Sequence, residues 1–142
     1  VVREILRVTR KGGRIVLADA DYGTASVDFE DTGLERRFVR FLAEEMRPDG
    51  YAGRRLYAYL KRCGLSEVKT EIFPFVFHRL DDTRLPFPVL ERLQEQAVFE
   101  PGEIEYWLKR LKEKERQGTF YFSLNMVLVH GIKSDKKSNQ NG

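Results

Sequence analysis

The sequence is poor in the residues that usually build metal sites and covalent catalytic sites. Its 142 residues include one cysteine and two histidines. A lone cysteine excludes an internal disulfide and a multi-cysteine metal site, so we expect no metal ion. No apolar run approaches the roughly 18 residues of a membrane-spanning helix, and no secretory segment follows Val1. We therefore expect a cytoplasmic protein without a membrane span.

The familiar catalytic and nucleotide-binding motifs are also missing. No serine stands in a G-x-S-x-G turn, and no G-x-G-x-x-G or Walker loop is present. The adjacent glycines Gly12 and Gly13 suit the end of a helix, where a left-handed residue is needed. The residues by themselves therefore identify no catalytic residue.

The charge balance is only slightly basic. There are 25 basic and 22 acidic residues, a net charge of +3, and two charges of that surplus fall in residues 131–142. Residues 134–142 contain no apolar side chain, so we expect a disordered basic and polar tail there. The preceding residues 1–133 have the size of one domain. With the surplus in the tail, we expect no nucleic-acid partner.

Hydrophobic periodicity predicts an alternation of helices and strands. Helices are expected over residues 1–9, 33–46, 51–63, 87–99 and 102–117, and strands over residues 14–19, 67–78 and 119–132. The run Ile15 to Ala18 is continuously apolar, which is typical of a strand covered on both faces in a parallel sheet. Pro74 lacks an amide hydrogen, so the strand around it should lie at a sheet edge or be bulged there. The order predicts an α/β fold.

Acidic and aromatic residues follow the first predicted strand. Asp19, Asp21 and Tyr22 stand there, and ligands of such α/β sheets gather beyond the carboxyl ends of the strands. Aspartate is equally common in turns, because its side chain bonds the backbone that follows it. The residues leave both interpretations of Asp19 and Asp21 open.

Three segments, in order, resemble the class I S-adenosylmethionine-dependent methyltransferases. ILRVTRKGGRIVLADADYGT (residues 5–24) resembles the stretch that joins helix D to strand 5. DGYAGRRLYAYLKRCGLSEVKTE (residues 49–71) is similar to the G-R-x-L helix and the start of strand 6 in the methyltransferase type 11 group, which is related to the ubiquinone and menaquinone enzymes. EIEYWLKRLKEKERQGTFYFSLNMVLVHGIK (residues 103–133) resembles the last helix and strand 7 of that group.

The resemblance implies a particular half of that fold. It covers the C-terminal part of a Rossmann-like domain, namely helix D and strands 5, 6 and 7 with inserted helices, and strands 1–4 have no counterpart here. In the family the cofactor, S-adenosylmethionine, is held by a glycine-rich loop after strand 1 and an acidic residue after strand 2. We therefore expect no cofactor-binding residue in this chain. The expected transferase activity belongs to a longer protein, and this fragment alone should be inactive.

The half that is present faces the methyl acceptor in the family. The resemblance carries the acceptor site to Asp19, Asp21 and Tyr22 after strand 5 and to Arg54 of the G-R-x-L helix. Asp21 would orient or deprotonate a small-molecule acceptor, and Arg54 would bind an anionic group or Asp21 itself. A solvated or ion-paired helix arginine is an equally good interpretation of Arg54.

Two further alternatives concern aromatic residues and the strand edge. The aromatic side chains suit either a lipophilic or aromatic acceptor or a simple core; they are Phe38, Phe41, Trp107 and Tyr121. The competing class of function is a non-enzymatic α/β module. Because the upstream neighbour of the strand at residues 14–19 is not encoded, its open edge favours a homodimer or a protein partner.

Overall fold

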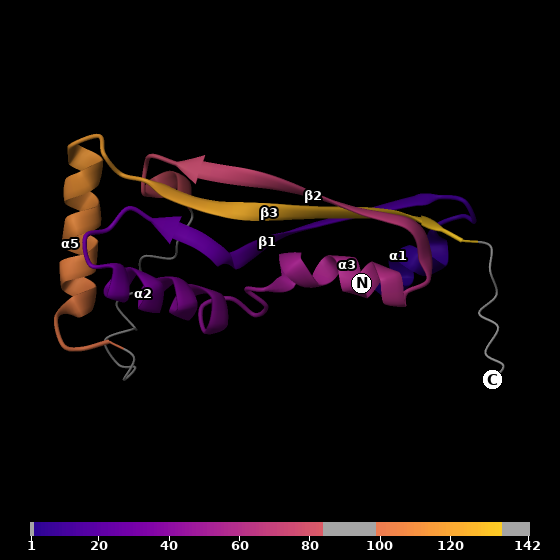
Figure 1. Cartoon of the computed structure of the whole chain (residues 1–142), viewed down its shortest axis with the longest axis horizontal. Coiled ribbons are helices and arrows are strands. Elements are labelled where there is room, and N and C mark those ends of the chain that lie inside the picture. Colours follow the sequence, from indigo (N-terminus) through magenta and orange to yellow (C-terminus); the bar gives the residue numbers. More distant parts are fainter. Residues whose placement is uncertain (1, 84–98, 135–142) are drawn as a thin grey trace.

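The computed structural model describes residues 2–83 and 99–134 and contains helices, one sheet and a short 3-10 turn. Figure 1 shows the elements in chain order. They are α1 (Val2–Val8), β1 (Arg14–Val27), α2 (Thr32–Glu44), α3 (Ala52–Arg62), β2 (Leu65–Phe77), η1 (Asp81–Thr83), α5 (Glu103–Arg116) and β3 (Phe122–Lys133). The α/β class is confirmed. The helix predicted over residues 87–99, apart from Phe99, and the tail after Ser134 lie outside the described residues.

Within the described residues, the sheet has three strands in the order β1-β3-β2. Both outer strands pair antiparallel with β3, so β1 and β2 run in the same direction without touching. The expectation of a parallel neighbour for β1 is therefore wrong for the strands described. β1 is also buried on one face only: Ile15 is 2% exposed, whereas Val16 is 52% exposed. The apolar run from Ile15 to Ala18 wrongly predicted a strand covered on both faces, because such a run also occurs in a strand with only one packed face.

β1 continues well past the predicted end at Asp19. Its pairing with β3 shifts between Asp21 and Ser26, which marks an irregularity of the β-bulge type. Thr24 bridges this irregularity: its hydroxyl donates to the Asp21 carbonyl at 2.6 Å and accepts from the Asn125 amide at 2.9 Å. Asp19, Asp21 and Tyr22 therefore lie within β1 and not in a loop after it.

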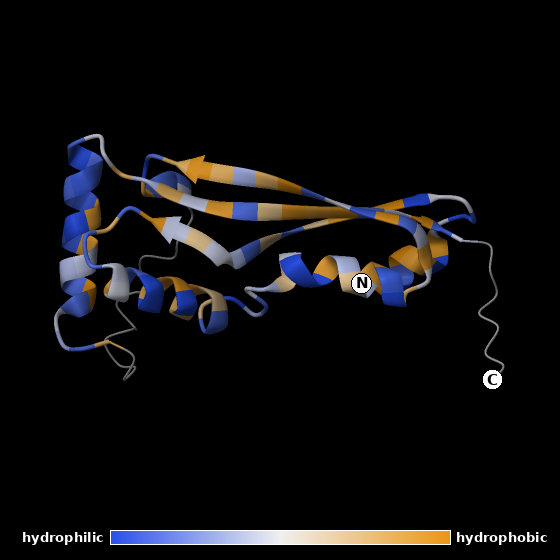
Figure 2. Cartoon of the chain, in the orientation of Figure 1, coloured by the Kyte–Doolittle hydropathy of each residue, from blue (hydrophilic) through white to orange (hydrophobic). Residues whose placement is uncertain are grey.

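β2 lies at the other edge of the sheet, as Pro74 predicts. Phe73, Phe75 and Phe77 oppose Met126, Leu124 and Phe122, so they share one face, as expected. Large apolar side chains remain exposed along this strand; Ile72 is 59% and Phe75 is 43% exposed. Figure 2 shows hydrophobic residues continuing to the end of β2.

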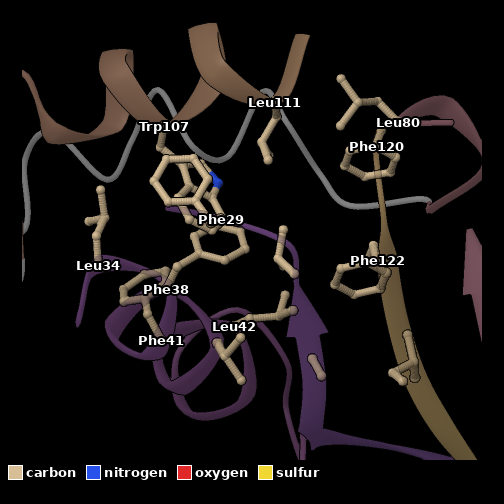
Figure 3. Close-up of a cluster of buried hydrophobic side chains, with 14 of the residues drawn as sticks. Phe29, Leu34, Phe38, Phe41, Leu42, Leu80, Trp107, Leu111, Phe120 and Phe122 are labelled. Atoms are coloured by element: carbon tan, nitrogen blue, oxygen red, sulfur yellow. The ribbon is translucent and has the colours of Figure 1, made fainter. Parts of the chain in front are cut away.

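The larger of two hydrophobic cores lies where α2 and α5 meet the end of the sheet (Figure 3). Trp107 is fully buried, and its ring lies 4.2 Å from that of Phe29 and 4.6 Å from that of Phe38, centroid to centroid. Phe122 and Leu124 bring β3 into this core. Close packing of large aromatic side chains holds α5 across this end of the sheet.

The smaller core lies under α3 at the other end of the sheet. It contains Leu60 from α3, Val127 and Val129 from β3, Ile15 from β1 and Leu65 from β2. Since side chains alternate along a strand, Val127 and Val129 face the side opposite to that of Phe122 and Leu124. The helices thus cover opposite faces of β3 at its two ends. In Figure 1 the strands cross over one another, because the sheet is twisted.

Candidate functional site

A bidentate ion pair joins β1 to α3 at the predicted acceptor site. Arg54 Nε donates to Asp21 Oδ2 at 2.7 Å, and Arg54 Nη2 donates to Asp21 Oδ1 at 2.9 Å. The Gly23 amide donates to the same Oδ1 at 3.1 Å. Of the two roles expected for Arg54, this geometry provides contact with Asp21 itself.

The burial of the two partners is unequal. The Asp21 side chain is 4% exposed, whereas the Arg54 side chain is 49% exposed. The hydrogen bonds from Arg54 to the Asp21 carboxylate raise the pKa of Arg54 above its ordinary value. The Asp21 carboxylate thus accepts three hydrogen bonds, two from Arg54 and one from the Gly23 amide, in a nearly buried position. Asp21 therefore acts first as an anchor for Arg54.

Two glycines allow α3 to lie close to β1. A Cβ atom on Gly53 would come within 2.9 Å of the Asp19 carbonyl oxygen and 3.0 Å of Val127 Cγ2. A Cβ atom on Gly23 would come within 2.5 Å of Arg54 Nη2 and still closer to the Tyr51 ring. The Gly-Arg dipeptide at residues 53–54 thus combines a close backbone approach with an ion pair across it.

A polar chain extends from this ion pair over the surface. Arg54 stacks on the ring of Tyr51, with its Cζ 4.8 Å from the centroid. The Tyr51 hydroxyl donates to Glu44 Oε1 at 3.1 Å, and Arg40 Nε donates to Glu44 Oε2 at 3.0 Å. Partial burial, and then the Glu44 contact, raise the pKa of Tyr51. Sequence reasoning missed Tyr51, Glu44 and Arg40, because their contact depends on the turn between α2 and α3.

Tyr22 and Asp19 have other surroundings. The Tyr22 amide donates to the Gly50 carbonyl at 2.8 Å, and the Arg47 guanidinium lies 4.6 Å from the centroid of the Tyr22 ring. Asp19 is exposed, and its Oδ1 accepts from the Ala20 amide at 2.8 Å. The structure thus brings Asp21 and Arg54 together, fastens Tyr22 to the turn after α2, and leaves Asp19 at the surface.

The aromatic residues considered for an acceptor pocket divide into two groups. Phe38, Phe41 and Trp107 are at most 4% exposed and belong to the larger core, whereas Tyr121 is 37% exposed. A hollow of about 860 Å³ opens beside α5 and includes Leu80, Leu108 and Lys112 in its lining. None of the four predicted site residues lines it. The core interpretation therefore accounts for the three buried rings.

Metal binding and membrane insertion gain no support from the described residues. Within residues 2–83 and 99–134, no three histidine, cysteine, aspartate or glutamate side chains are placed to share a metal ion. In the same part of the chain, no helix has the length and apolar character needed to cross a bilayer.

Comparison with known proteins gives one short likeness. No family model matches the chain. A stretch of 53 residues is 32% identical to a Streptomyces fradiae protein described as an uncharacterized 37.1 kDa protein in transposon TN4556. This match covers 37% of the present chain but 15% of the length of that protein. The likeness therefore assigns neither a family nor an activity.

Proposed function

We propose that this chain is the acceptor-side part of a longer S-adenosylmethionine-dependent methyltransferase. The proposal begins from the three ordered segments that resemble helix D and strand 5, the G-R-x-L helix and strand 6, and the last helix and strand 7. In that correspondence strand 5 is β1, strand 6 is β2 and strand 7 is β3. The substrate is a small molecule that accepts a methyl group.

The observation that carries the proposal is the direction of the strands. β1 and β2 run the same way, and the chain crosses between them through α2 and α3, as in the strand–helix–strand units of doubly wound α/β folds. β3 lies between them and runs the opposite way. Sheets that mix parallel and antiparallel strands are common among doubly wound folds, so this arrangement is compatible with one part of such a sheet.

The Asp21–Arg54 pair is the positioning element of the proposed acceptor site. It holds the irregular part of β1 against the first turn of α3, and Tyr22 lies next to it in the chain. For methyl transfer, the protein mainly has to align the acceptor and exclude water. A rigid strand and helix joined by a bidentate pair suit that task.

The residues of this chain do not fit the cofactor itself. The glycines with positive φ, Gly12, Gly64, Gly102 and Gly118, border helices α1, α3 and α5. Gly12, Gly64 and Gly118 each follow a helix, and Gly102 precedes α5 but is separated from β2 by η1. None of these four therefore forms the tight turn directly after a strand in which glycines cradle nucleotides in related folds. We therefore assign S-adenosylmethionine binding to residues outside this sequence.

Two measurements test the proposal. An in-frame coding sequence upstream of Val1, with a glycine-rich loop about a hundred residues earlier, is expected from the missing strand–helix units; a stop codon in its place would contradict the proposal. In calorimetric titration, the 142-residue chain should not bind S-adenosylmethionine. Micromolar binding by this chain would overturn the assignment of the cofactor site to residues outside it.

A non-enzymatic strand-pairing module is the second candidate, and the exposed edge strand β2 favours it. Ile72, Phe73, Phe75 and Val76 are between 43% and 59% exposed, and apolar edge strands invite pairing with another chain. Size-exclusion chromatography with light scattering distinguishes the two. A monomer or a defined dimer with a cooperative melt supports a self-sufficient module, whereas an aggregate without a cooperative melt supports a severed part of a larger domain.

A further inference from the structure

One end of the molecule carries an excess of basic over acidic residues. Of the residues in α1 and the turn that leads into β1, five are basic and exposed: Arg3, Arg7, Arg10, Lys11 and Arg14. One acidic residue, Glu4, lies among them and pairs with Arg7. Figure 2 shows the hydrophilic turn between α1 and β1 at the right-hand end of the sheet.

Three other segments add to the same end. Lys61 and Arg62 close α3, Lys69 lies near the start of β2, and Lys133 ends β3. Arg62 and Lys133 line one hollow together with Leu6 of α1, so these segments are neighbours in space. The Arg14 position pairs with Ile132, next to Lys133. We call residues 2–14, 61–69 and 130–134 together the basic end.

The basic end contains nine basic and two acidic residues, and the rest of the sequence contains 16 basic and 20 acidic residues. The overall charge of +3 is therefore the sum of a positive basic end and a negative remainder. Sequence reasoning assigned the surplus of positive charge to the tail, because the charges of the basic end and of the acidic remainder nearly cancel when they are added over residues 1–132. The folded part itself therefore has a basic end.

Local structure explains only a small part of this charge. The C-termini of α1 and α3 lie at the basic end, and each carries about half a negative charge. Lys133 Nζ donates to the carbonyl oxygens of Leu6 and Thr9, which accounts for one cation at the end of α1. After both helix ends are counted, a surplus of about six positive charges remains. Such a surplus is unfavourable by itself and favours a polyanion as partner.

We propose that the basic end binds the phosphate backbone of a nucleic acid, independently of the proposed methyl transfer. Five of its nine basic residues are arginines, whose planar fork matches phosphate oxygens. A membrane surface fits less well, because a helix that binds there must insert an apolar face. The apolar residues Ile5 and Leu6 of α1 pack against the smaller core instead.

The test is the salt dependence of binding to a short fluorescein-labelled DNA duplex, measured by anisotropy between about 50 and 200 mM NaCl. The whole chain should bind with a dissociation constant in the micromolar range at the lower salt concentration. The logarithm of the affinity should fall linearly with the logarithm of the salt concentration, by about 0.9 per phosphate contact.

Matched charge reversals locate the contact. Arg10→Glu, Arg14→Glu and Arg62→Glu together should weaken binding at least tenfold and lower the salt slope by about three. Lys109→Glu, Lys112→Glu and Arg116→Glu change the charge equally on exposed positions of α5 and should leave the affinity within about twofold of the parent. Replacing the same three arginines by lysine keeps the positive charges and should preserve the slope.

Three results would overturn the proposal. The first is equal loss of binding in the two triple variants, and the second is loss of binding on removal of residues 135–142 alone, which would assign it to the tail. The third is sedimentation of the protein with phosphatidylserine vesicles together with an absence of DNA binding. Retention of DNA binding without the tail, with loss only in the basic-end variant, is the supporting result.

Discussion

Removal of the Arg54 guanidinium tests whether the Asp21–Arg54 pair holds α3 on β1. In Arg54→Ala the buried Asp21 carboxylate keeps the Gly23 amide as a described partner. Breaking a fully buried pair costs about 3–5 kcal/mol. Because the Arg54 side chain is 49% exposed, water screens the pair, and we expect the free energy of unfolding to fall by about 1–3 kcal/mol.

The neighbouring arginine provides the control. Arg55 pairs with Asp49, and their side chains are 63% and 50% exposed, so Arg55→Ala should cost at most about 1 kcal/mol. Urea unfolding followed by circular dichroism at neutral pH measures both variants. In a double-mutant cycle, Asp21→Ala and Arg54→Ala should together cost less than the sum of the single changes. Equal losses in Arg54→Ala and Arg55→Ala would refute the reasoning.

The remaining predictions concern packing, capping and titration. Gly53→Ala should lower the free energy of unfolding by about 1–2 kcal/mol in urea melts, because its Cβ atom meets backbone. At Gly33 the nearest atom to an added Cβ atom is the side-chain Oδ1 of Asp31, at 3.3 Å, so Gly33→Ala should cost less than Gly53→Ala; equal effects would contradict the close approach. Lys133→Met should speed hydrogen exchange in α1, and unchanged exchange would show that its two carbonyl contacts do not hold the helix. The Arg40 hydrogen bond is the largest cause that lowers the pKa of Glu44, so Arg40→Gln should raise that pKa toward its ordinary value in an NMR titration. The contribution of this pair to stability is present above the ordinary pKa and is lost as the pH falls through the lower, folded value; an unchanged Glu44 pKa would exclude the contact.

The elements of the fold were predictable where one local signal decided the outcome. The alternation of Phe73, Phe75 and Phe77 specified a strand with two distinct faces, and Pro74 specified its place at an edge. The length of β1 was not predictable in this way. The side chain of Thr24 replaces part of the regular pairing with β3. Its partner Asn125 is distant in the sequence, so no pattern in the residues around Thr24 predicts the contact.

The candidate site was predictable in its members but not in its arrangement. The resemblance indicated Asp21 and Arg54, and the structure shows them in contact. The Asp21 carboxylate is buried because Gly23 and Gly53 allow β1 and α3 to lie close together. Neither the composition nor the spacing of residues predicts that burial. The basic end was missed for a related reason, since its residues come from four segments that meet only in the fold.

The proposed methyltransferase is best tested by binding of S-adenosylmethionine to the polypeptide extended through its upstream reading frame. We expect micromolar binding by calorimetry for the extended protein and no binding for residues 1–142 alone. Arg54→Ala in the extended protein should leave cofactor binding intact, because we propose that Arg54 lies on the acceptor side. An extended protein that folds cooperatively and does not bind S-adenosylmethionine would contradict the claim.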